Sequence, residues 1–188
     1  MNTENVFQTI LAKLFNHSNA KFVQYIHQGN CEHPCADCPP KHKRIFENNN
    51  SKPKVGWINH PHCDCRYRDV ETMKVGTVSN KGITSPDVYL KAYGHLPDYY
   101  ITKDEARKLG WKEGKNLAHF APGKMIGGDE YNNKKHILPE KEGRKWRECD
   151  VDYTGLKRNS LRLYYSSDGL VFYSPDHLDG DVTVYQIK

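Results

Sequence analysis

The sequence has 188 residues, of which 37% are hydrophobic and 11% aromatic, and this composition suits a folded protein of one large domain or two small ones. No apolar run approaches the roughly 20 residues that a membrane-spanning helix needs, which excludes a transmembrane protein. The net charge of +5 favours an anionic partner only weakly, because many proteins without such a partner are equally basic.

The start of the chain predicts no secretory signal peptide. Residues 1–5 have no basic start, and Lys13 interrupts the apolar positions that follow. The first expected element is an amphipathic helix over residues 6–15, because apolar residues recur there at spacings of three and four. A short strand over residues 21–27 should follow.

A cysteine- and histidine-rich stretch comes next. Residues 1–66 hold five of the six cysteines and six of the ten histidines. The cysteines form a C-x3-C-x2-C motif that ends at Cys38 and a C-x-C motif at Cys63. Two such clusters separated by a loop predict a structural zinc site that would staple a small module poor in apolar residues. The predicted ligands are Cys35, Cys38, Cys63 and Cys65. Disulfides are an alternative, although no export signal indicates an oxidising compartment, and unmodified thiols are another.

The change in composition along the chain predicts three parts. Residues 1–66 should form the cysteine- and histidine-rich module, residues 67–84 a linker and residues 85–188 a second domain. Gly76 and few large apolar residues are typical of a connector.

The second domain is expected to start with helices. Ser85 with the following proline predicts the start of a helix, and Gly94 ends that helix. A capping box at Thr102 starts a second helix, which ends at Gly110, and a third short helix is expected over residues 116–120.

The residue pattern then changes from helical to alternating. Strands are predicted over residues 145–153, 161–165, 170–173 and 182–187. Helices followed by closely connected strands predict an α+β fold, with the N-terminal helices packed on an antiparallel sheet.

The open face of this sheet carries unusual charge. Glu148 and Arg162 fall in the middle of strands, and Arg158 and His177 lie in adjacent turns. A surface ion-pair network would explain the pattern without any catalysis. A binding or catalytic site would explain it as well, because strands favour apolar or neutral residues unless charges pair or a ligand needs them.

The second domain also resembles a known family, the barnase-like, guanyl-preferring bacterial ribonucleases. Matching stretches run from residue 96 to the C-terminus, with similar spacing across most of them. They are residues 96–103, 109–111, 121–129, 146–148, 158–160, 165–168 and 176–177.

The resemblance implies the microbial ribonuclease fold and a catalytic role for five residues. Glu148 takes the position of the general base and His177 that of the general acid. Lys103, Arg158 and Arg162 match cations around the scissile phosphate. The implied reaction is metal-independent endonucleolytic cleavage of single-stranded RNA to a 2′,3′-cyclic phosphate.

Several neighbouring residues should have structural roles. The resemblance implies that Asp150 neutralises Arg158 and Arg162, and that Asp168 pairs with Arg144. Burial statistics favour packing roles for a further set of large or apolar side chains. These are Trp111, Trp146 and Cys149.

The stretch that corresponds to the family's base-binding loop departs from the family pattern. The candidate base-binding residues are Tyr131, Asn132, Asn133, Lys134 and Lys135. Lys134 stands where the family has an arginine, and Lys135 replaces an acceptor glutamate with a donor, so guanine preference is not expected to carry over. Leu178 replaces an aromatic residue, which should weaken stacking on the base.

The first module loosely resembles the cysteine-containing tail of phage minor head proteins. The match consists of residues 35–38 and 60–65. This resemblance suggests a delivery or docking role.

Together these features predict a monomeric toxin-type ribonuclease whose partners are RNA and an acidic, barstar-like immunity protein. Such a toxin would be cytoplasmic or would leave through a dedicated export route. A non-catalytic RNA-binding or phage-structural protein that retains the fold is the alternative. A metal-dependent DNA nuclease is less favoured, because thiolate-rich sites are usually closed structural ones.

Overall fold

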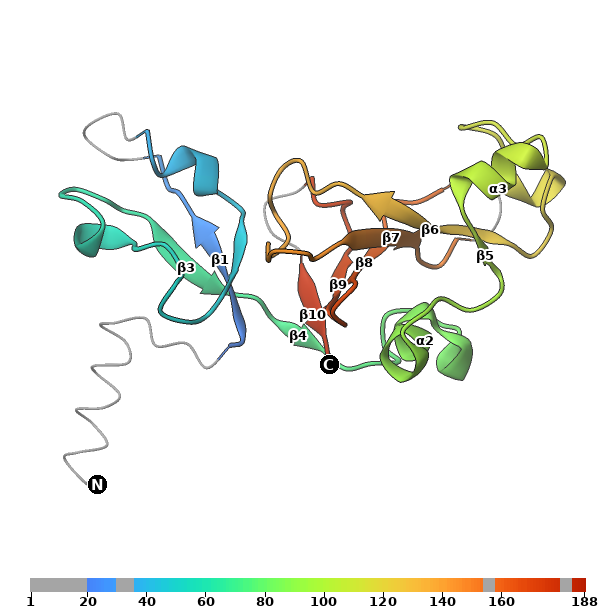
Figure 1. Ribbon diagram of the computed structural model, residues 1–188, viewed down its shortest axis with the longest axis horizontal. Coiled ribbons are helices and arrows are strands. Elements are labelled where there is room, and N and C mark those ends of the chain that lie inside the picture. The colour runs from blue at the N-terminus through green and yellow to red at the C-terminus, as the bar shows by residue number, and fades with distance from the viewer. Residues whose placement is uncertain (1–19, 30–35, 154–157, 180–183) are drawn as a thin grey trace, which may run out of the picture. The chain divides into compact units, whose positions relative to one another are not determined.

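The chain forms two compact units, seen in a computed structural model that describes residues 20–29, 36–153, 158–179 and 184–188 (Figure 1). The first unit comprises Met1–Val70 together with Lys135–Pro139, and the second comprises Glu71–Lys134 with Glu140–Lys188. The helix expected over residues 6–15 lies outside the described residues. No helix among the described residues is long and apolar enough to cross a membrane.

The first unit contains a three-stranded antiparallel sheet in the order β2-β1-β3. The strands are β1 (Phe22–Ile26), β2 (Ile45–Glu47) and β3 (Arg66–Asp69), and the 3-10 turns are η1 (Pro39–Lys41) and η2 (Gly56–Ile58). The strand predicted over residues 21–27 is therefore confirmed as β1. Residues 22–25 of β1 are buried, as expected for a central strand with neighbours on both edges.

A second chain segment, Lys135–Pro139, completes this first unit. The backbone amide of Ile45 at the start of β2 donates a hydrogen bond of 2.7 Å to the carbonyl of Ile137. Ile137 and Leu138 are both buried. The first unit thus includes Lys135, the last of the predicted base-binding residues, and the four residues that follow it.

The second unit is built on a seven-stranded sheet in the order β4-β10-β9-β8-β7-β6-β5. Its strands are β4 (Thr72–Met73), β5 (Tyr100–Ile101), β6 (Met125–Tyr131), β7 (Trp146–Asp150), β8 (Arg162–Ser166), β9 (Val171–Ser174) and β10 (Tyr185–Ile187). Strands β6 to β10 pair antiparallel, as predicted, and β8 and β9 lie between β7 and β10 in Figure 1. The prediction of a purely antiparallel sheet is wrong at both edges. There β5 pairs in parallel with β6, and β4 pairs in parallel with β10. These two-residue strands are too short to show a sequence period.

The helices of the second unit are short. They are α2 (Pro86–Tyr93), α3 (Lys103–Lys108) and the 3-10 turns η3 (Gly82–Thr84) and η4 (Leu117–His119). The capping box at Thr102 is confirmed, and Gly94 ends α2 with φ +76°. The helix expected over residues 116–120 is a single 3-10 turn. Ser85 occupies the N-cap, but its hydroxyl donates to the carboxylate of Asp87 instead of accepting from the backbone.

Both α-helices pack on the sheet through one apolar core. Leu90 of α2 and Ala106 of α3 share that core with Trp111 and with residues of six strands. The buried strand residues are Tyr100, Met125, Ile126, Cys149, Leu163, Val171 and Ile187. This arrangement leaves the other face of the central strands available for charged side chains.

The domain boundaries proposed from the sequence differ from these units in two respects. Residues 67–84 contain most of β3 together with β4 and η3, whereas an irregular linker was expected. The sequence also gave no indication that Lys135–Pro139 belongs to the first unit.

Candidate active site

The central carboxylate of the charged face is Glu148, in the middle of β7. It pairs in register with Asp129 of β6 and Tyr164 of β8. Because side chains alternate along a strand, Glu148 points away from the apolar core that holds its neighbour Cys149. Its side chain is 12% exposed, so one edge of the carboxylate remains accessible.

A bulge in β6 brings that strand close to β7. The register shifts between Gly127 and Asp129, and Gly128 has φ +97°. A Cβ atom on Gly127 would lie 2.4 Å from the Cβ of Cys149 and 2.6 Å from the Cδ1 of Tyr100. Only glycine at position 127 therefore allows β6 to lie this close to β7. The additional residue of the bulge directs the carboxylate of Asp129 toward α3.

Asp129 in turn positions Lys103, the first residue of α3. The backbone amide of Lys103 donates to both carboxylate oxygens of Asp129 at 3.1 Å. Burial raises the pKa of Asp129, and the hydrogen bond from Lys103 opposes that shift. The Lys103 side chain then extends to Glu148, with 3.0 Å between Nζ and Oε1. The base candidate and one cation candidate are therefore in direct contact.

His177 lies in the turn that follows β9. His177 and Leu178 both have left-handed backbone conformations, with φ +61° and +59°. The buried hydroxyl of Ser174 accepts a hydrogen bond of 2.9 Å from the backbone amide of Leu178 and thereby stabilises this turn. The imidazole Nε2 lies 4.0 Å from Glu148 Oε2, and the side chain is 45% exposed. Strained backbone at such a position is common in functional sites.

The two arginine candidates converge on one buried carboxylate, that of Asp150, as the resemblance implied. Arg158 donates to it from Nε at 2.6 Å and from Nη2 at 2.8 Å, and this hydrogen bonding raises the pKa of Arg158. Arg162 Nε lies 3.1 Å from Asp150 Oδ1 without the alignment of a hydrogen bond. Asp150 lies two residues after Glu148 on β7. Its buried carboxylate therefore holds two guanidinium groups close to each other and beside Glu148.

The arrangement combines a proton acceptor, a proton donor and three cations on one face. Glu148 and His177 lie on either side of a 4.0 Å gap, and Lys103 contacts the carboxylate directly. Such a set can remove one proton, supply another and stabilise negative charge on phosphoryl oxygens. The structure therefore brings together all five catalytic candidates predicted from the sequence.

The candidate base-binding residues do not all belong to the same unit. Tyr131 to Lys134 are in the second unit, and Lys135 is in the first. The Tyr131 ring packs against that of Tyr164 at 4.7 Å, and Asn133 is buried with φ +47°. Leu178, which stands where the family has an aromatic residue, is also buried and so does not present a stacking surface.

The supporting residues pack as expected. Arg144 Nε and Nη2 hold the carboxylate of Asp168 at 2.8 to 3.1 Å, which lowers the pKa of Asp168 to about 2. The side chains predicted to have packing roles, Trp111, Trp146 and Cys149, are all buried.

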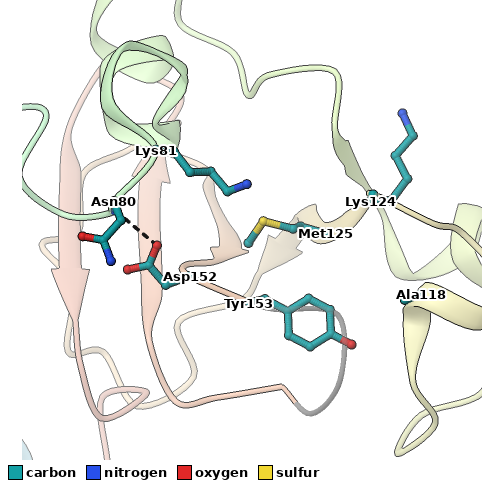
Figure 2. A pocket seen from close by; sticks show the side chains of 8 residues that line it. Asn80, Lys81, Ala118, Lys124, Met125, Asp152 and Tyr153 are labelled. Carbon is teal, nitrogen blue, oxygen red and sulfur yellow. Dashed lines mark hydrogen bonds between the residues drawn. The ribbon is translucent and has the colours of Figure 1, made fainter.

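A cavity elsewhere on the second unit has a volume of about 480 Å³ and is lined by two lysines (Figure 2). Lys81 extends into it, whereas Lys124 points away and donates to the carbonyl of Asp98. Neither Glu148 nor His177 lines this cavity. We therefore place the candidate active site on the charged face of the sheet, which carries the acid, base and cation candidates, and not in this cavity.

Three of the four predicted metal ligands lie together in the first unit. Cys38, Cys63 and Cys65 form one buried cluster with Tyr25, and Cys35 lies outside the described residues. His60 joins the cluster, although its position in the sequence did not predict it as a ligand. Its position three residues before Cys63 was the available signal.

Comparisons with known proteins match the part of the chain that contains the charged face. A family model described as ribonuclease matches residues 84–183. A ribonuclease of Heyndrickxia coagulans is 52% identical over 90 residues, which are 47% of this chain and 83% of that protein. Ribonucleases of Bacillus intermedius and Bacillus pumilus are also 52% identical over 90 residues, and the match spans about half of each, 56%.

Proposed function

We propose a mechanism and a biological role for this chain, which belongs to the ribonuclease family and carries the endoribonuclease domain of that family in residues 84–183. The proposal assigns Glu148 as general base and His177 as general acid in metal-independent cleavage of single-stranded RNA. The observation that carries it is the 4.0 Å separation of Nε2 and Oε2 beside three cationic side chains. A carboxylate and an imidazole so close can act on two oxygens of a single phosphodiester.

The proposed reaction begins at the ribose. Glu148 takes the proton of the 2′-hydroxyl, and the 2′-oxygen forms a bond to the adjacent phosphorus. The bond from phosphorus to the 5′-oxygen then breaks, and His177 gives its proton to that oxygen. The products are a 2′,3′-cyclic phosphate and a free 5′-hydroxyl. DNA is inert in this scheme because it lacks the 2′-hydroxyl.

The cations stabilise the charge that develops on the phosphoryl oxygens. Lys103, Arg158 and Arg162 supply the positive charge that does this, and Asp150 holds both guanidinium groups in place. Since this set performs every step, the chemistry requires no metal ion. The described groups of side chains that could hold a metal all lie between residues 27 and 65, so any metal there would have a structural role.

The base preference of the enzyme is proposed to differ from that of its guanine-preferring relatives. Lys134 offers a single ammonium where the family has the planar fork of arginine, and Lys135 offers donors in place of a carboxylate. Sequencing of cleavage products would identify the base on the 5′ side of each cut. A strict preference for guanine would contradict this part of the proposal.

The biological role we propose is that of a toxin whose producer makes an acidic immunity protein. A general ribonuclease harms the cell that synthesises it unless an inhibitor covers the site. The cationic groups of the proposed site favour an acidic inhibitor, because complementary charge accelerates association. If no neighbouring gene product protects cells that express the chain, this role is wrong.

Cleavage of RNA in the presence of EDTA tests the catalytic assignment. Glu148→Ala and His177→Ala should each lower the rate by about 10²- to 10⁴-fold, the usual contribution of a general acid or base. Glu130→Ala and His119→Ala are matched controls, because both residues are exposed and lie outside the proposed set. Mass spectrometry of early products should detect the cyclic phosphate.

The alternatives predict different results in the same assay. RNA binding without cleavage by the folded wild-type protein would favour a non-catalytic RNA-binding or phage-structural protein. Loss of activity in EDTA together with cutting of DNA would favour a metal-dependent nuclease. Rates that stay within a few-fold of the wild type in both active-site variants would refute the assigned roles.

A further inference from the structure

A cluster of sulfur and imidazole groups lies at the centre of the first unit. Cys38, Cys63 and Cys65 are buried as thiols around Tyr25. The sulfur atoms of Cys38 and Cys63 are 3.9 Å apart, which is far beyond a disulfide bond. Cys38 Sγ also lies 3.4 Å from His60 Nε2, and these three donor atoms all fall within 4.8 Å of one another.

These distances match the edges of a zinc tetrahedron. Bonds of about 2.3 Å to sulfur and about 2.0 Å to nitrogen place two sulfur ligands about 3.8 Å apart. The same geometry places a sulfur and a nitrogen ligand about 3.5 Å apart. The observed separations of 3.9 Å between the two sulfur atoms and 3.4 Å between sulfur and nitrogen agree with these values. Two edges of one face of a tetrahedral site are therefore already present, and the third, between Cys63 and His60, is no longer than 4.8 Å.

The fourth ligand is Cys65. It packs in the same buried cluster as Cys38 and Cys63. Its sulfur atom lies outside the group of donor atoms that fall within 4.8 Å of one another, so its side chain must turn toward them when the ion binds. Cys65 also belongs to a neighbouring group with His27 and Asp64, in which His27 Nδ1 lies 3.3 Å from the sulfur. We assign His27 to this second role, as a hydrogen-bond donor to Cys65, because the three thiols and His60 already provide four ligands.

Polar groups around the sulfur atoms give independent support. The hydroxyl of Tyr25 donates to Cys38 Sγ at 3.2 Å, and the side-chain amide of Asn59 donates to the same sulfur at 3.4 Å. Thiolates carry negative charge, and donors aimed at them both orient the ligands and stabilise that charge. Neutral thiols in an apolar core would not need such partners.

We propose that Cys38, His60, Cys63 and Cys65 bind one zinc ion. Three thiolates and one imidazole in a tetrahedron suit zinc better than calcium, magnesium or manganese, which prefer oxygen ligands. All four positions are occupied by protein atoms, so the ion is structural and has no open position for a substrate. Binding requires the three thiols to lose their protons, which are released to solvent.

The metal content of the purified full-length chain tests this proposal. The wild-type protein should hold one equivalent of zinc after dialysis, measured by mass spectrometry of the elements. Cys63→Ser and His60→Ala should reduce the content to near zero. Cys149→Ala and His62→Ala, which alter a cysteine and a histidine outside the ligand set, should retain it.

Cobalt provides a readout that does not depend on the folding of variants. Wild-type protein loaded with Co²⁺ should show the intense visible bands of a tetrahedral ion and the near-ultraviolet absorption of bound thiolates. Absence of these bands would overturn the proposal. A disulfide between Cys38 and Cys63, detected by mass spectrometry under non-reducing conditions, would overturn it as well.

The ligand set itself is open to refutation. Cys65→Ser should release the metal, whereas Cys35→Ser should retain it. The opposite pattern would show that Cys35 is the fourth ligand and that the assignment of Cys65 is wrong. Cleavage of RNA measured in the same samples keeps this result separate from the catalytic proposal.

Discussion

The two units bury polar groups in different ways. In the second unit, one carboxylate, Asp150, is buried between two guanidinium groups beside an apolar core that spans the sheet. In the first unit, the buried cluster consists of three thiols and Tyr25. The second unit thus supplies its own counter-charges and its own apolar packing. The first unit also buries apolar side chains such as Phe22, Ile45 and Leu138, but three thiols lie in its interior, so its stability should depend in part on what those thiols bind.

Metal removal should separate the two units most clearly. A strong chelator should abolish hydrogen-exchange protection in β1, β2 and β3, because zinc contributes about 10 kcal/mol or more to the folding of small metal-stapled modules. Strands β7 to β9 should remain protected, and RNA cleavage should persist. Unchanged protection in β1 would mean that the first unit does not depend on the metal.

Removing the buried carboxylate should have the next largest effect. Asp150→Asn leaves two guanidinium groups without their counter-charge and should lower the free energy of unfolding of the second unit by about 3 kcal/mol. Chemical denaturation measures this change. Asp104→Asn is the matched control, because that aspartate is 80% exposed in its ion pair with Arg107, and it should cost about 0.5 kcal/mol or less. Equal effects would refute the special role of Asp150.

A single methyl group tests the close approach of β6 and β7. Gly127→Ala would place a Cβ against Cys149 and Tyr100, and we expect a loss of about 2 kcal/mol from the forced shift of the strand. Activity should fall as well, because the bulge positions Asp129 and through it Lys103. A melting temperature equal to that of the wild type would show that β6 moves without cost.

The smallest effect concerns the pair of Arg144 and Asp168. Its contribution to stability is complete above the ordinary carboxyl pKa near 3.8 and disappears as the pH falls through about 2, because the pKa of Asp168 is lowered in the folded protein. Asp168→Asn should cost about 1 kcal/mol at pH 7, reduced by solvent because the carboxylate is 36% exposed. The difference between variant and wild type should shrink as the pH falls toward 2 and vanish below it. A difference that stays constant across that range would exclude the ion pair as its source.

The sequence predicted the charged face well and the first unit less well, for physical reasons. Glu148 and Arg162 stand out because charges in the middle of strands break a local alternation. His60 was missed because a histidine near cysteines has no local signature that separates a ligand from a surface residue. The parallel edge strands β4 and β5 were missed because pairing between distant segments leaves no periodic signal in two residues.

The placement of Lys135–Pro139 has a consequence for how this protein can be cut or recombined. A catalytic fragment that starts at residue 71 would still carry Ile137 and Leu138, whose burial and backbone partner belong to the first unit. Such a fragment would expose two apolar side chains next to its predicted base-binding loop. Fusing the nuclease domain to another protein would therefore require polar replacements at both positions.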